Sequence, residues 1–149
     1  MSNQLEKFGL RPYRKLDGTP LAGAQNRYTI KPGYGTAIYQ GDLVIPVSTG
    51  NIERHTAGNG SAVVGVFNGV FYKNFYPGGI TPTQGDITAF VVDDPDAVFL
   101  MDADQSFVRA DLFKNYHVTN AGGVTQTGIS SVQLDVSSSG TKVTFVVQA

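Results

Sequence analysis

Five aspartates lie close together in the sequence: Asp93, Asp94, Asp96, Asp102 and Asp104. Carboxylate oxygens on a tight turn are ligands that a hard cation such as Ca²⁺ prefers. The spacing matches no EF-hand loop, because the run has no glycine at the sixth place and no glutamate at the twelfth. Aspartate and proline are also ordinary turn formers. The sequence therefore favours a structural turn around Pro95 over a calcium site.

His55 and His117 are the only histidines of the chain. A Ser-His-Asp arrangement needs a nucleophile in a context such as Gly-x-Ser-x-Gly, which the sequence does not contain. Two histidines and a carboxylate can hold a metal, but no spacing specifies such a site here. The glycine pairs at 33–35 and 58–60 carry no Walker lysine and indicate turns. We predict no catalytic residue, no metal site and no cofactor.

A cluster of four aromatic residues comes just before Pro77: Phe71, Tyr72, Phe75 and Tyr76. Tyrosine and phenylalanine are enriched in the cores of protein interfaces, where lysine and glutamate are depleted. The cluster is therefore a candidate partner interface. Two alternatives stay open, since the same residues can belong to the protein's own core or to the exposed aromatics of a glycan-binding module.

The N-terminal segment is a second candidate interface. Four cations, Lys7, Arg11, Arg14 and Lys15, are interleaved there with apolar side chains, and the only acid before Asp17 is Glu6. The interface candidates in this segment are Phe8, Leu10, Arg11, Tyr13 and Arg14. Residues 1–20 could form an extended arm that lies along a neighbouring chain. The alternative is that they form an ordinary first strand of the domain.

Composition limits the other functions. The chain has 149 residues, which is enough for a single β domain over residues 1–149. Its net charge is −1, so it has no basic footprint for nucleic acid. It has no cysteine, which excludes disulfides and thiolate chemistry. No stretch approaches about 20 continuous apolar residues, and the N-terminus has no signal-peptide pattern. We expect a protein made in a cytoplasm, with neither nucleic-acid nor membrane partners.

Short apolar segments broken by glycine and proline predict an all-β fold, either a barrel or a sandwich, with at most one short helix. The expected strands are 27–31, 36–39, 43–47, 62–72, 87–92, 97–101, 132–136 and 141–147. Residues 106–113 could make one or two helical turns, and residues 51–61 are expected to form a polar surface loop. Pro46 cannot donate to a β-ladder, which predicts an edge or a bulge at that point.

Residues 62–72 allow two interpretations. Asn68-Gly69 between apolar residues is typical of a type I′ hairpin turn. One long strand is the alternative, with Phe67 and Phe71 sharing a face with the small residues Gly65 and Gly69. We favour the single strand.

Several segments, in order, are similar to small virion proteins of tailed bacteriophages, the capsid decoration or cement class. They are residues 9–14 and 16–20, 35–44, 65–72, 92–99, Asp111 with Asn115, and 127–135. The resemblance implies an all-β, non-enzymatic protein on the outside of a phage head, with the major capsid protein as partner and a homotrimer as its own state. Other hypotheses are a head-fibre or tail component and a glycan-binding β-sandwich module.

Overall fold

The computed structural model describes residues 9–20, 25–56, 63–81, 85–94, 96–106, 108–111, 115–119, 123–136 and 145–146. Strands dominate these residues, and their helical part is the 3₁₀ turn η1 (Arg109–Asp111) together with Val136, which is also in 3₁₀ conformation. The predicted all-β fold class is confirmed. Within the helical segment expected at 106–113, η1 is the helical part of the described residues.

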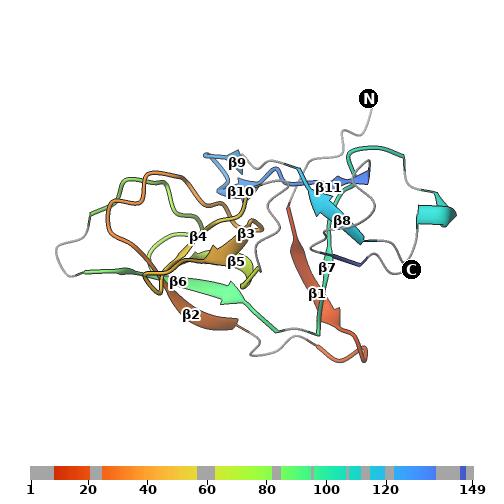
Figure 1. Ribbon diagram of the computed structural model, residues 1–149, viewed down its shortest axis with the longest axis horizontal. Coiled ribbons are helices and arrows are strands. Elements are labelled where there is room, and N and C mark those ends of the chain that lie inside the picture. Colours follow the sequence, from red (N-terminus) through yellow and green to blue (C-terminus); the bar gives the residue numbers. More distant parts are fainter. Residues whose placement is uncertain are drawn as a thin grey trace.

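The largest unit is a five-stranded antiparallel sheet (left in Figure 1). Its strands, in spatial order, are β2 (Gln25–Ile30), β6 (Ile87–Val92), β5 (Gly65–Val70), β3 (Leu43–Pro46) and β4 (Ile52–Arg54). The hydroxyl of Thr29 on β2 donates a hydrogen bond of 2.7 Å to Asn51, which directly precedes β4. The two edges of the sheet therefore approach each other, and the sheet curls like a small, partly open barrel.

The other strands form three small sheets (right and top in Figure 1). β1 (Arg11–Lys15) pairs with β7 (Ala97–Leu100). β8 (Asn115–Val118) lies between β11 (Leu134–Asp135) and β12 (Phe145–Val146). β9 (Gly123–Val124) pairs with β10 (Ile129–Ser130). An isolated parallel bridge between Gln40 and Ile129 links β10 to the segment that precedes β3 of the five-stranded sheet.

Two hydrophobic cores lie on opposite faces of the five-stranded sheet, because successive side chains of a strand point to opposite faces. On β3 and β5, Val44 and Phe67 enter the first core, whereas their neighbours Leu43 and Val66 enter the second. The first core consists of Ile30, Ile38, Val44, Ile52, Phe67, Val70, Tyr76, Ile87, Ala89 and Val91. The second consists of Leu10, Leu43, Val66, Val118 and Val132. Burial on both faces explains why residues 63–70 read as an almost continuous apolar run.

The hairpin interpretation of residues 62–72 is wrong, whereas the favoured single strand is confirmed in a shorter form, β5. β5 ends at Val70, and the chain turns at Phe71 and Tyr72 rather than at Asn68-Gly69. The register with β6 shifts between Phe67 and Val70, so Asn68 and Gly69 form a bulge inside the strand. Gly69 has φ of +109°, which a side chain would strain. The Asn-Gly pair therefore bends the strand instead of closing a hairpin.

The N-terminal segment behaves as a strand. β1 pairs with β7 from Arg11 opposite Leu100 to Lys15 opposite Ala97, with an irregularity at Tyr13. Leu10 lies in the second core. The interpretation of residues 1–20 as a free arm is therefore wrong for residues 9–15, which pack within the chain, while residues 1–8 lie outside the described residues.

Several local expectations also change. Residues 36–39 make only an isolated bridge, Ile38 with Tyr76, in place of a strand. The loop expected at 51–61 begins with the strand β4. β3 lies between β5 and β4, but only Leu43 and Val44 of β3 pair with β5. Pro46 lies beyond this pairing, so its lack of a backbone N–H breaks no hydrogen bond to β5. The strands expected at 132–136 and 141–147 are represented in the described residues by β11 and β12, respectively.

Candidate contact surface

The four clustered aromatics separate into an exposed pair and a buried pair. Phe71 and Tyr72 are 67% and 47% exposed, whereas Phe75 is 6% and Tyr76 0% exposed. Phe75 stacks on Tyr39 with ring centroids 5.4 Å apart. The expectation that all four share one contact surface is therefore wrong for Phe75 and Tyr76, because the chain's own core encloses their rings.

The exposed pair lies on a tight turn between Val70 and Lys73. The amide of Val70 donates to the carbonyl of Lys73 at 2.8 Å, and the reverse bond is 3.3 Å. The rings of Phe71 and Tyr72 meet edge to face with centroids 4.9 Å apart. Gly69 allows this closure, because a Cβ there would lie 3.0 Å from the carbonyl oxygen of Lys73. The turn thus holds two large apolar rings in solvent on a short, hydrogen-bonded support.

Among the N-terminal candidates, some side chains are exposed and others enclosed. Tyr13 is 57% exposed at the irregularity of β1, Arg11 is exposed, and Arg14 is half-buried. The guanidinium of Arg14 lies 5.8 Å from the ring centroid of Tyr13. Leu10 is buried in the second core, so it is unavailable to a partner, and Phe8 lies outside the described residues.

The acidic turn is occupied by contacts within the chain. The amide nitrogen of Asn26 donates to both carboxylate oxygens of Asp93 at 2.8 and 3.0 Å, and the hydroxyl of Tyr28 also donates to Asp93. The carboxylate of Asp94 accepts the backbone N–H of Asp96 at 2.9 Å and pairs with Lys15 at 3.4 Å. These contacts tie β2 and β1 to the turn, in agreement with its interpretation as structural.

Removal of the Tyr28 hydroxyl should weaken this link. The hydrogen bond to Asp93 raises the pKa of Tyr28, since it favours the protonated phenol. Hydrogen bonds to charged groups contribute about 1.5–3 kcal/mol, so we expect Tyr28→Phe to lower the free energy of unfolding by about 1.5 kcal/mol. Urea titration measures the change. The matched control, Tyr13→Phe at an exposed position, should be near neutral, and equal effects of the two variants would contradict the prediction.

The buried carboxylate of Asp42 is a functional candidate that the sequence did not reveal. It is fully buried, accepts the backbone N–H of Tyr39 at 2.8 Å and accepts the hydroxyl of Ser130. Burial raises the pKa of Asp42 to about 6, against the hydrogen bonds from Ser130 and Tyr39 and the charge of Arg54. Its place after Gly41 looks like an ordinary turn in the sequence, and no local signal marks the distant Ser130 as its partner.

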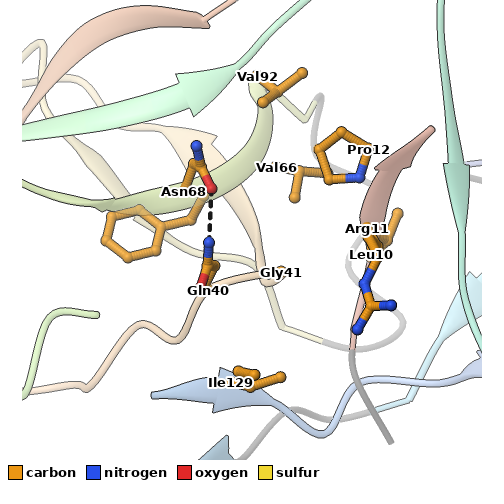
Figure 2. A pocket seen from close by; sticks show the side chains of 10 residues that line it. Leu10, Arg11, Pro12, Gln40, Gly41, Val66, Asn68, Val92 and Ile129 are labelled. Carbon is orange, nitrogen blue, oxygen red and sulfur yellow. Dashed lines mark hydrogen bonds between the residues drawn. The ribbon is translucent and has the colours of Figure 1, made fainter. Parts of the chain in front are cut away.

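A cavity of about 160 Å³ lies next to this junction (Figure 2). Figure 2 shows Gln40 and Asn68 on one side, joined by a hydrogen bond of 2.9 Å, with Leu10 and Arg11 across from them. The lining residues are Leu10, Arg11, Pro12, Gln40, Gly41, Val66, Phe67, Asn68, Val92 and Ile129. The cavity is bounded mainly by apolar side chains, with the amides of Gln40 and Asn68 on one side and Arg11 on the other.

The histidines lie in different places. His55 is buried directly after β4, and its backbone N–H donates to Leu43, whereas His117 is part of β8. Across the residues that the structure describes, no group of three or more His, Cys, Asp or Glu side chains could hold a metal ion. The arrangement thus supplies contact surfaces and one small cavity.

Comparison with known proteins identifies no relative. No family model, curated protein or solved structure matches this chain. Within the described part of the chain, no helix has the length and apolar character needed to cross a membrane.

Proposed function

We propose that this chain is a non-enzymatic virion structural protein, a decoration or cement subunit that binds the major capsid protein on the outside of a phage head. The proposal rests on the ordered resemblance of its sequence segments to that class. The packing of three of these segments is consistent with it. Asp42 from residues 35–44 and Ser130 from residues 127–135 bond to each other, and the backbone of Phe67 from residues 65–72 donates to Asp42 at 2.8 Å.

The exposed pair Phe71 and Tyr72 is the structural observation that supports the proposal. Large apolar side chains that protrude from a rigid turn are costly to leave in water and act as anchors when a partner encloses them. Tyr13 on β1 and Leu100 on β7 are further exposed apolar side chains. A protein whose role is to lie between other chains needs such surfaces.

The mechanism of a cement protein is mass action. A subunit that binds only the assembled, expanded shell stabilises that state by its free energy of binding. Many copies across capsomer boundaries add their contributions and oppose the pressure of packaged DNA. Self-association as a homotrimer would multiply the contacts of each subunit with the shell.

Loss of the two exposed rings should impair binding to the shell. Truncation of central aromatic anchors costs at least about 2 kcal/mol, so we expect Phe71→Ala/Tyr72→Ala to bind capsids at least about 30-fold more weakly. Co-sedimentation with capsids that lack the protein, followed by cryo-EM of the pellet, measures the affinity and occupancy.

The control is Val108→Ala, which also removes an exposed apolar side chain (57% exposed) but lies away from the turn. It should bind normally, and both variants should retain the wild-type melting temperature. Wild-type protein that never binds capsids would refute the proposed function, whereas a double variant with normal occupancy would refute only the role of this turn.

A further inference from the structure

The cavity beside Asn68 has the size of one six-membered ring. Its volume is about 160 Å³. An apolar protein cavity of about 150 Å³ holds a benzene molecule. Val66 and Val92 form its wall on the five-stranded sheet, and Leu10, Pro12 and Ile129 close it from the N- and C-terminal segments. A ligand that fills it must therefore present a compact ring with apolar surface.

The amides of Gln40 and Asn68 line one side of the cavity, and they form a row with a third amide, Gln25, which does not line it. The Nε2 of Gln40 donates to Asn68, and the Nδ2 of Asn68 donates to Gln25 on β2. A primary amide has two N–H donors and an oxygen that accepts two bonds, so each of these contacts leaves a donor over. Within the described residues, the Oε1 of Gln40 accepts no hydrogen bond. Spare donors and acceptors thus alternate along the row.

We propose that this cavity is a binding site for one neutral sugar ring. A pyranose has C–H groups on its faces, which suit the apolar walls, and hydroxyls around its rim, each of which donates and accepts a hydrogen bond. A purely aromatic ligand would offer no acceptor to the remaining N–H groups of Gln40 and Asn68 while shielding them from water, which costs affinity. A divalent cation is disfavoured because no carboxylate lines the cavity and Arg11 does.

Saturation-transfer NMR on the full chain tests the proposal, with methyl glycosides of glucose, galactose, mannose and N-acetylglucosamine as probes. We expect at least one glycoside to bind with a dissociation constant on the order of millimolar, as suits a single small ring. The cresol p-methylphenol serves as the probe for an aromatic ring without a sugar's hydroxyls.

Asn68→Leu should weaken glycoside binding at least about tenfold, since it removes hydrogen bonds worth roughly 1.4 kcal/mol together. Gln126→Leu is the control, because Gln126 is an exposed amide that does not line the cavity. Ile129→Phe, which fills the cavity, should also abolish binding. Circular dichroism identifies any variant that fails to fold.

Three results would overturn the proposal: no binding of any of the four glycosides, binding of p-methylphenol alone, or equal binding by Asn68→Leu and Gln126→Leu. The site does not depend on the proposed capsid role. Asn68→Leu should still decorate capsids at normal occupancy, so failure of sugar binding and failure of capsid binding are distinguishable.

Discussion

A chain truncated to begin at Leu16 should lose its native fold. The deletion removes Leu10 from the second core and leaves β7 without β1. A buried Leu→Ala substitution alone costs about 2–5 kcal/mol, out of a total stability of about 5–15 kcal/mol. Gly9 shows how tightly this segment is held, because a Cβ there would lie 2.7 Å from the Cβ of Ser130. Thermal unfolding followed by circular dichroism should therefore show no cooperative transition.

Two point variants refine the test. Leu10→Ala should lower the free energy of unfolding by about 2–5 kcal/mol, whereas Tyr13→Ala, at an exposed position of the same segment, should change it by less than about 1 kcal/mol. A truncated protein that keeps the wild-type melting temperature and only fails to bind capsids would restore the arm interpretation. Destabilisation by Leu10→Ala would confirm that the segment is part of the core.

The second large effect is a dependence of stability on pH through Asp42. Its pKa is raised from 3.8 to about 6 in the folded protein, so folding favours the protonated carboxyl. Its contribution is therefore complete below the unfolded pKa and is lost as the pH rises through about 6. A difference of roughly two pKa units corresponds to about 3 kcal/mol. We expect wild-type stability relative to Asp42→Asn to fall by up to this amount between about pH 4 and about pH 7.

The asparagine variant isolates this contribution from the other carboxylates. Its carbonyl oxygen can accept the backbone N–H of Tyr39, and its amide can donate to the hydroxyl oxygen of Ser130. Urea titrations of both proteins across the pH range give the difference in the free energy of unfolding. Asp94→Asn, which affects a carboxylate at the acidic turn, should leave the Asp42 contribution unchanged. A wild-type minus Asp42→Asn difference that is constant with pH would contradict the assignment.

The sequence predicts the strands whose signal is local. The apolar run Ile87–Val92 has the predicted bounds, and the predicted 97–101 differs from β7 by one residue. Strand β4 was not predicted, because two of its three residues, Glu53 and Arg54, are charged, as is typical of a surface loop. The burial of Ile52 depends on the neighbouring strand β3, and no local pattern contains that information.

The candidate contact surface likewise combines a signal that is local in the sequence with contacts that only the fold creates. Composition identified the aromatic cluster, but it could not separate Phe71 and Tyr72 from Phe75 and Tyr76. Their separation follows from the turn after Val70 and from the stacking of Phe75 on Tyr39, which lies far away in the sequence. The cavity was likewise beyond prediction, because Leu10, Asn68 and Ile129 meet only in the folded chain.

The second core has a consequence for the order of events during synthesis. It joins Leu10, near the start of the chain, to Val132, near its end. A ribosome that has released the first hundred residues has supplied β7, the pairing partner of β1, but not Val118 and Val132 of the second core. Contacts of such long sequence separation form slowly, since the loop must close before they stabilise anything. The second core can therefore close only once Val132 has been synthesised, and a nascent chain that stops before this residue leaves that core incomplete.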